Sequence, residues 1–136
     1  ELYRTPVTDA AASVLKNYVN LEASFATALD VLDGFAKENS VDFGDARREF
    51  ADFAKAAPAF ANARFEAGFG RAMDYYSGII FEVNLPEAGL SGPLVVGGRY
   101  DGLFEILGAS SPIPAVGFAA AFDRISLADE LVGELS

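Results

Sequence analysis

The first third of the chain places apolar residues at the helical period of about 3.6 residues. Residues 8–19 carry one apolar face, residues 21–38 a longer stripe, and residues 43–57 a face of phenylalanines. This pattern predicts three helices, of which the second is one long amphipathic helix, and Pro58 marks the end of the third. We expect the phenylalanines to pack in a core. The stripes consist of Ala11, Val14, Leu15 and Tyr18; of Leu21, Phe25, Leu29, Leu32 and Phe35; and of Phe43, Phe50 and Phe53.

After Pro58 the period changes to 2, which is typical of strands. Residues 61–69 alternate small or aromatic residues with polar ones, and this predicts a half-buried strand. Residues 77–85 and the apolar run 94–96 predict two more strands, and the short connections imply antiparallel pairing. Residues 97–108 then show a glycine-rich turn and helical spacing.

The last segment, residues 115–135, predicts a short strand followed by a helix. Its apolar residues are expected to face inward. The whole order of elements is typical of an α+β protein with an antiparallel sheet flanked by helices. The inward residues are Phe118, Phe122, Ile125, and Leu131 or Val132.

Composition narrows the possible chemistry. The 136-residue chain is 51% hydrophobic, which favours one globular domain at most. It has no cysteine and no histidine, which excludes disulfides, thiolate zinc sites and catalytic triads built on these residues. A net charge of −10 argues against a stand-alone nucleic-acid binder, although single arginines can still form an anion pocket. No membrane-spanning run or signal peptide is visible, so we expect a cytoplasmic protein.

Three polar clusters lie at predicted strand ends, where binding residues concentrate on rigid folds. They are residues 71–76, 97–102 and 117–124. Taken singly, each has a plain structural explanation: a glycine turn, tyrosines with solvated hydroxyls, or an arginine paired with a nearby carboxylate. None matches the strong patterns of phosphate loops or zinc sites.

Taken together, the clusters resemble a known family. The segments RAMDYYSGIIFEV, VVGGRYDGL and PAVGFAAAFDRI occur in this order. They resemble the C-terminal half of the catalytic domain of histidyl-tRNA synthetases and of a paralogous group, the regulatory subunits of ATP phosphoribosyltransferase in histidine biosynthesis. The resemblance covers roughly residues 59–136 and implies a partial class II aminoacyl-tRNA synthetase-like domain. Residues 1–58 then correspond to a helical insertion or flanking helices.

The resemblance implies roles for individual residues. In that family the arginine of the first motif, here Arg71, lies against the histidine carboxylate and the phosphate. Tyr76 and Tyr100 stand where tyrosines border the imidazole pocket. Gly97 and Gly98 stand where the backbone approaches the ligand closely, as a missing Cβ allows.

Arg124 stands where the synthetases have the arginine that contacts the ATP phosphates. The histidine amine needs a carboxylate, for which Glu66 and Glu82 are both candidates. No residue receives a catalytic or metal-binding role. The supporting positions are Asp74, Tyr75, Glu82, Arg99 and Asp101.

Two functions remain open, and a third alternative is a structural fragment that binds no ligand. The presence of Arg71 and Arg124 is compatible with a synthetase, which activates histidine with ATP and transfers it to tRNA. Synthetases, however, usually have Gly at the position of Ala121 and Glu at that of Asp123, and the methyl of Ala121 would crowd the adenine. Ala72 also replaces a usual Gly. The chain ends soon after the third motif, whereas synthetases continue into an anticodon-binding domain.

These departures favour the regulatory subunit, which binds histidine and has no catalytic activity of its own. Its expected partners are histidine and the catalytic subunit of ATP phosphoribosyltransferase, in a homodimer or a hetero-oligomer. We expect no cofactor, no membrane and no nucleic acid. ATP and Mg²⁺ would be needed only by the synthetase alternative.

Overall fold

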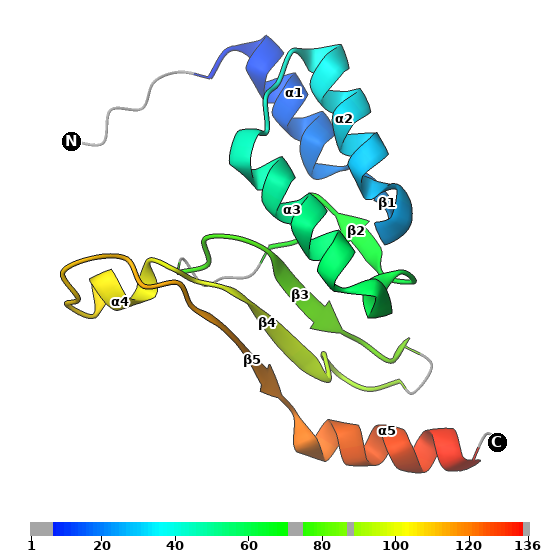
Figure 1. Ribbon diagram of the computed structural model, residues 1–136. Helices are drawn as coiled ribbons and strands as arrows, with labels where there is room; N and C mark the ends of the chain where they lie inside the picture. Colours follow the sequence, from blue (N-terminus) through cyan, green and yellow to red (C-terminus); the bar gives the residue numbers. More distant parts are fainter. Residues whose placement is uncertain (1–6, 71–74, 87–88, 135–136) are drawn as a thin grey trace. The chain divides into compact units, whose positions relative to one another are not determined.

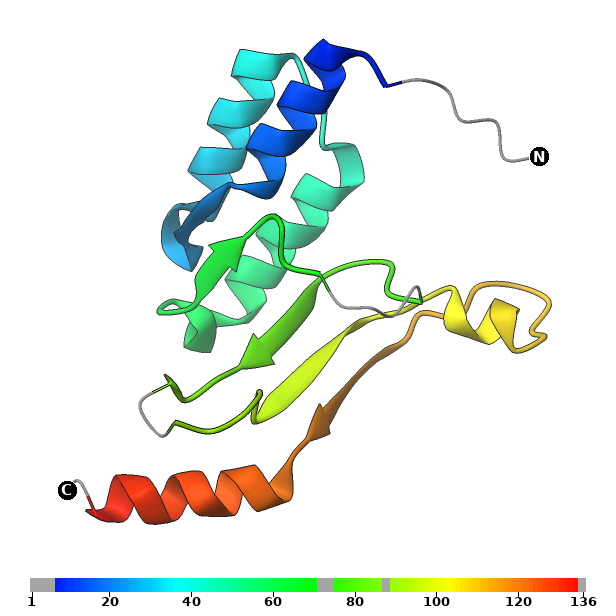
Figure 2. The same ribbon diagram turned by 180° about the vertical axis from the view of Figure 1, so that it is seen from behind.

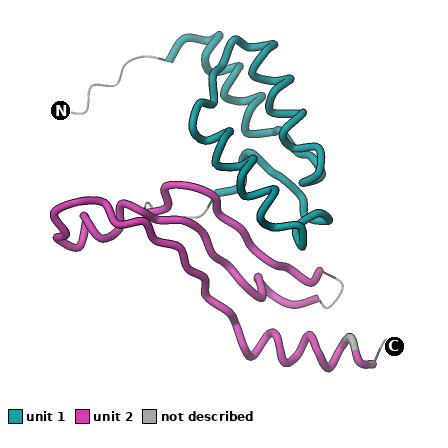
Figure 3. Tube along the Cα trace, in the orientation of Figure 1, with its two compact units in different colours: residues 1–70 teal, residues 71–136 magenta. Residues whose placement is uncertain are grey.

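The computed structural model describes residues 7–70, 75–86 and 89–134 (Figure 1). The chain forms two compact units, which divide between Gly70 and Arg71 (Figure 3). We call them the helical unit and the sheet unit. Together they contain helices and two small antiparallel sheets, which confirms a mixed α+β architecture.

The helical unit contains α1 (Asp9–Val19), α2 (Ala28–Asn39) and α3 (Gly44–Ala56). The hydroxyl of Thr8 caps α1 by accepting a hydrogen bond from the backbone N–H of Ala11 at 3.2 Å. The first and third predicted helices are therefore confirmed, and the third ends before the proline as expected.

The prediction of one long helix over residues 21–38 is wrong in its first part. Glu22–Ser24 form strand β1, which pairs antiparallel with β2 (Arg64–Glu66). A 3-10 turn, η1 (Phe25–Thr27), then leads into α2. Pairing with a strand far along the chain supplies backbone hydrogen bonds that overrule the local helical pattern.

Strand β2 confirms the half-buried strand predicted over residues 61–69, although it is shorter. Phe65 is half-buried, whereas Arg64 and Glu66 are exposed. A short 3-10 helix, η2 (Pro58–Phe60), precedes it. Since β2 pairs within the helical unit, the division of the compact units falls after it. The predicted boundary between residues 58 and 59 concerns the extent of the family domain and stays a prediction.

The core of the helical unit consists of the buried Ala28, Leu32 and Phe35 of α2 and of half-buried aromatic rings, so the phenylalanines pack inside as the sequence predicts. Phe35 is 7% exposed, and its ring centroid lies 5.8 Å from that of Tyr18 on α1. A second cluster surrounds Phe25, whose ring meets those of Phe50 and Phe53 edge to face at 5.4 and 5.8 Å. Leu15 departs from the prediction, since it is 58% exposed on α1.

The sheet unit is built on strands β3 (Ile80–Val83), β4 (Val95–Arg99) and β5 (Val116–Ala120). They pair antiparallel in the order β3-β4-β5, which confirms the pairing predicted for residues 77–85 and 94–96. The strand predicted over residues 61–69 does not join this sheet, because β2 pairs with β1. The short helix α4 (Leu103–Ile106) lies beyond the end of β4, and α5 (Phe122–Glu134) continues from β5. Figures 1 and 2 show β5 at one edge of this sheet from both sides.

Alternate residues of a strand face opposite sides, so the strand register assigns each residue to a face of this sheet. We call the two sides the tyrosine face and the apolar face. The tyrosine face carries Ile80, Glu82, Val96, Gly98, Gly117 and Ala119, and the apolar face carries Phe81, Val83, Val95, Gly97, Phe118 and Ala120.

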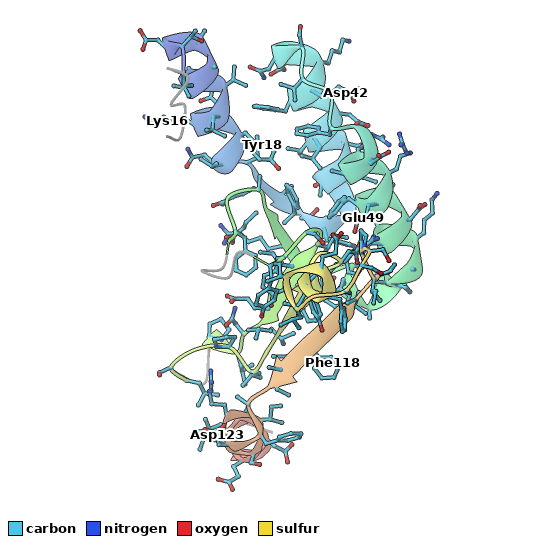
Figure 4. All side chains as sticks on the ribbon, turned by 90° about the vertical axis from the view of Figure 1, so that its left-hand side faces the viewer. Lys16, Tyr18, Asp42, Glu49, Phe118 and Asp123 are labelled. Carbon is cyan, nitrogen blue, oxygen red and sulfur yellow. The ribbon has the colours of Figure 1, made fainter. Side chains whose placement is uncertain are left out.

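The prediction that Phe118 and Phe122 face inward is wrong. They are 73% and 78% exposed, and Figure 4 shows the Phe118 ring extending away from β5. Among the described residues of this unit, the two helices lie at the ends of strands (Figure 1), and the Phe118 side chain stays exposed. Ile125 and Leu131 are half-buried, in agreement with the expectation. Ala128, which lies between them in the sequence, is buried.

Candidate functional site

The predicted ligand residues converge only partly within the described structure. Arg71 and Asp74 lie outside the described residues, so the predicted anion contact and its loop support remain predictions. Tyr75, Tyr76 and Tyr100 are described, and the structure brings these three side chains together.

The three tyrosines form one cluster at the end of the sheet. The rings of Tyr75 and Tyr76 lie 4.8 Å apart between centroids and are tilted by 41°. Tyr100 meets both edge to face, at 5.7 Å from Tyr75 and 6.3 Å from Tyr76. Edge-to-face and tilted pairs at these distances attract one another beyond simple burial. The two predicted ring contacts, Tyr76 and Tyr100, are thus neighbours in space.

Two glycines of the tyrosine face form a floor without side chains, which we call the glycine floor. Gly98 and Gly117 are cross-strand partners on β4 and β5. A Cβ added at Gly98 would lie 2.7 Å from Cε1 of Tyr76, and one added at Gly117 would lie 2.1 Å from the hydroxyl oxygen of Tyr100. Each glycine therefore makes room for a tyrosine ring. Its neighbour Gly97 faces the other way.

Gly97 belongs to the apolar face. A Cβ there would lie 2.8 Å from Phe81 Cε1, 2.8 Å from Phe118 Cβ and 2.6 Å from the carbonyl oxygen of Gly117. The missing Cβ atoms of Gly97 and Gly98 consequently open space on opposite sides of the sheet. The sequence motifs suggested one shared role for Gly97 and Gly98 and did not single out Gly117. A glycine is required at position 117 because of its contact with Tyr100, which follows the neighbouring strand.

Asp101 ties together the chain segments around Tyr100. Its Oδ2 accepts a hydrogen bond from Arg99 Nε at 2.8 Å, and its Oδ1 accepts one from the backbone N–H of Ala115 at 3.0 Å. Its own backbone N–H donates to the Ser77 hydroxyl at 2.9 Å. The N–H of Tyr100 donates to the carbonyl of Ala115 at 2.9 Å.

This network joins the segment before β3, the end of β4 and the start of β5. The guanidinium of Arg99 and then the backbone N–H of Ala115 hold the pKa of Asp101 below its ordinary value of 3.8, so the carboxylate stays charged. Arg99 and Asp101 were predicted to have supporting roles. Their contacts define a structural role, whereas any effect on a ligand stays a prediction.

The two candidate carboxylates for the histidine amine differ in their surroundings. Glu82 is half-buried on β3 and belongs to the tyrosine face, where its Oε1 accepts a hydrogen bond from Asn84 at 2.9 Å. Glu66 belongs to the helical unit, and its Oε1 lies 3.1 Å from Nε of Arg64. Glu82 thus shares a face with the tyrosines, and the choice between the two carboxylates stays a prediction.

Arg124 lies at the other end of the sheet. Its guanidinium donates a hydrogen bond of 2.5 Å to the carbonyl of Pro93 and borders an open hollow of about 470 Å³. The hollow is lined by the segment that leads into β4, the end of β5 and the start of α5. Its lining residues are Pro93, Leu94, Val96, Ala119, Ala120, Ala121, Asp123 and Arg124.

The hollow reaches the tyrosine face at Val96 and Ala119, although Ala120 of the apolar face also lines it. Gly98 and Val96 both point to this side of β4 and are two residues apart, a step of about 7 Å along a strand. The tyrosine face therefore carries aromatic rings with hydroxyls at one end, and the hollow that reaches its other end is bordered by the guanidinium of Arg124. Such groups suit the binding of a small polar ring compound and a nearby anion.

The described residues offer neither a candidate metal site nor a candidate membrane span. Among them, no three acidic side chains gather where they could hold a metal ion. None of the helices they form has the length and apolar character needed to cross a membrane.

Comparisons with known proteins agree with the motifs. A family model described as histidyl-tRNA synthetase matches residues 1–125, and so also covers the helical segment that the motifs do not reach. Several similar proteins are named ATP phosphoribosyltransferase regulatory subunit. The chain is 40% identical to one from Chelativorans sp. (strain BNC1) over 88% of its length and 33% of that protein.

Two further relatives with the same name come from Rhizobium rhizogenes (strain K84), at 40% identity, and from Brucella anthropi, at 35%. The matches cover 93% and 98% of this chain but 35% and 36% of those proteins, respectively. The chain thus spans about a third of the length of these relatives. With the family model matching nearly its whole length, the chain belongs to the histidyl-tRNA synthetase family.

Proposed function

We propose that this chain is part of a regulatory subunit of ATP phosphoribosyltransferase, which binds histidine and adjusts the activity of a catalytic partner. The observation that carries the proposal is the shared name of relatives at 35–40% identity that match 88–98% of this chain. The proposal includes a class II synthetase-like fold for the complete domain and a cytoplasmic location. It also includes a homodimer or hetero-oligomer, and it needs no cofactor.

The tyrosine cluster supports histidine as the ligand. An imidazole ring is planar, carries one donor and one acceptor when neutral, and stacks on aromatic rings. Tyr76 and Tyr100 offer ring faces and hydroxyls at 6.3 Å between centroids. Arg71 precedes this cluster in the sequence and is proposed to bind the carboxylate of histidine, with Glu82 as the proposed partner of its amine.

Arg124 is proposed to take no part in catalysis. Its hydrogen bond to the carbonyl of Pro93 gives it a structural partner within the sheet unit. If a nucleotide is retained, the hollow beside Arg124 is its candidate location, since the guanidinium borders that hollow.

Regulation requires that histidine binds one state of the complex more tightly than another, because only differential affinity shifts a conformational equilibrium. In the proposed mechanism histidine occupies the tyrosine face and changes the affinity or activity of the catalytic chain. Reciprocity then demands that the catalytic chain change the affinity of the regulatory subunit for histidine by the same factor.

The second candidate is a fragment of a histidyl-tRNA synthetase, favoured by the description of the matching family model. It requires ATP, Mg²⁺ and tRNA. The two functions differ in a measurable reaction, since only the synthetase catalyses histidine-dependent exchange of pyrophosphate into ATP. Exchange by the full-length protein would overturn the regulatory proposal, and its absence together with histidine binding would support it.

Calorimetric titration of the full-length protein with histidine tests the binding site. We expect saturable binding that falls at least tenfold in Arg71→Ala, because the charged partner of the carboxylate is lost. Arg48→Ala is a matched control, since Arg48 is an exposed arginine paired with Asp45 on the helical unit. Absence of binding at millimolar histidine, or equal binding by both variants, would contradict the proposed site.

A further inference from the structure

We propose that Gly117 is a positioning residue. Because it has no side chain, it leaves the space over β5 that the hydroxyl of Tyr100 occupies, and this position of Tyr100 sets the affinity of the site for the histidine ring. The inference rests on the proposed function for its ligand. Its geometric part, the dependence of Tyr100 on Gly117, stands on the contacts alone.

The contact is too close for any side chain at Gly117. A Cβ there would lie 2.1 Å from the Tyr100 hydroxyl oxygen, 3.2 Å from Cζ and 3.5 Å from Cε1. The hydroxyl is thus the atom in severe conflict, whereas Cζ would need to move by only a few tenths of an ångström. The backbone of Tyr100 cannot withdraw freely, because its N–H is bonded to the carbonyl of Ala115.

Backbone conformation does not explain the glycine. Positive φ angles among the described glycines occur at Gly44, Gly89, Gly92 and Gly108, and Gly117 is not among them. Glycine inside a strand normally weakens it, since it packs nothing and loses more entropy on folding. The space that the Tyr100 hydroxyl occupies is therefore the physical reason for glycine at this position.

Moving Tyr100 would disturb the other two tyrosines. Its ring meets those of Tyr75 and Tyr76 edge to face. The Tyr76 ring in turn lies close to Gly98, where an added Cβ would be 2.7 Å from its Cε1. A methyl at Gly117 is expected to push the Tyr100 ring off the glycine floor and change the separation of Tyr76 and Tyr100. The histidine ring is proposed to bind against these two rings, so its affinity depends on how they are arranged.

A double-mutant cycle in the full-length protein separates this effect from general damage. Histidine affinity is measured by calorimetry for the wild type, Gly117→Ala, Tyr100→Phe and the double variant. We expect Gly117→Ala to weaken histidine about tenfold. The double variant should bind like Tyr100→Phe alone, because phenylalanine lacks the atom in conflict. Unchanged affinity in Gly117→Ala, or losses that multiply in the double variant, would overturn the proposal.

Gly102→Ala is the matched control. Gly102 lies in the same segment as Tyr100, has a φ of −80° that alanine adopts freely, and an added Cβ there meets nothing within 4 Å. We expect it to leave histidine affinity unchanged. If Gly117→Ala fails to fold, the double variant decides: it should fold and bind like Tyr100→Phe, and its failure to fold as well would overturn the proposal.

A readout without ligand keeps the inference distinct from the proposed function. Tyrosines are labelled with 3-fluorotyrosine, and the ¹⁹F resonance of Tyr100 is assigned by its loss in Tyr100→Phe. Gly117→Ala should shift this resonance and Gly102→Ala should not. If the wild type binds no histidine, the proposed function fails while this shift still supports the positioning of Tyr100. An unmoved Tyr100 resonance overturns the inference whatever the ligand.

Discussion

The two compact units use aromatic residues in different ways. In the helical unit, phenylalanine rings pack against one another between helices, as Phe25 does with Phe50 and Phe53. In the sheet unit, Tyr76 and Tyr100 lie over glycines of β4 and β5. The first arrangement fills a core, whereas the second leaves ring faces and hydroxyls over a floor without side chains.

The two arrangements are expected to respond to different kinds of substitution. A packed phenylalanine contributes by burial, and its truncation to a small residue leaves a cavity. A tyrosine ring over a glycine needs the space that a side chain would fill. Adding a methyl group at that glycine is therefore more harmful than removing one from an exposed side chain. The helical unit should therefore respond to truncation and the glycine floor to enlargement.

Phe35→Ala should give the largest loss of stability. Phe35 is 7% exposed and contacts the rings of Tyr18 and Phe43, so truncation is expected to cost about 3 kcal/mol. Leu15→Ala is the control on the same unit, because Leu15 is 58% exposed and should lose less than about 1 kcal/mol. Urea unfolding followed by circular dichroism measures both. Equal losses would contradict an aromatic core centred on α2.

Gly98→Ala should destabilise by adding an atom. The new Cβ would lie 2.7 Å from Tyr76 Cε1 and 2.8 Å from the carbonyl oxygen of Ile79, and the backbone contact cannot move aside. Overpacking of this kind costs about 2 kcal/mol. Gly102→Ala, with nothing within 4 Å of its added Cβ, should be neutral in the same urea titration. A neutral Gly98→Ala would show that the sheet yields and that the floor is not required.

Sequence periodicity predicted the helical unit better than it predicted what the elements cover. The apolar stripes located α1, α3 and most of α2, because local spacing determines which side of a helix is buried. They missed β1, since its partner β2 lies far along the chain. They also assigned Phe118 to the interior, because periodicity identifies a side of a strand but not whether another element packs on it.

The candidate site was predictable only in part for a related reason. The motifs and the family resemblance pointed to Tyr76 and Tyr100, and the structure places these rings together. They did not show that Gly97 and Gly98 serve opposite faces, which follows from strand alternation once the register is known. The dependence of Tyr100 on Gly117 arises from a contact between residues of two different motifs, so neither motif shows it alone.

Ser77→Ala tests the network that joins the strands around Tyr100, with a smaller expected effect. It removes the acceptor for the backbone N–H of Asp101 at 2.9 Å, and a hydrogen bond at an exposed position contributes about 1 kcal/mol or less. Ser110→Ala, at an exposed loop position of the same unit, is the control in urea unfolding. If the two variants lose the same stability, the Ser77 hydroxyl does not help to hold the network.

Asp101→Asn should produce the smallest effect, recognisable by its dependence on pH. Arg99 and the N–H of Ala115 hold the pKa of Asp101 below 3.8 in the folded protein. A carboxyl with a lowered folded pKa stabilises the fold above its unfolded pKa, and this contribution disappears as the pH falls through the folded pKa. The urea midpoint of the wild type should therefore exceed that of Asp101→Asn at about pH 6, and the difference should shrink below about pH 4.

The control for this prediction is the difference in urea midpoint between the wild type and Ser77→Ala. A serine hydroxyl does not titrate in this range, so that difference should lack the pH dependence expected for Asp101→Asn. If the urea midpoint of the wild type exceeds that of Asp101→Asn by a constant amount down to about pH 2.5, the charge of Asp101 does not stabilise the network around Tyr100.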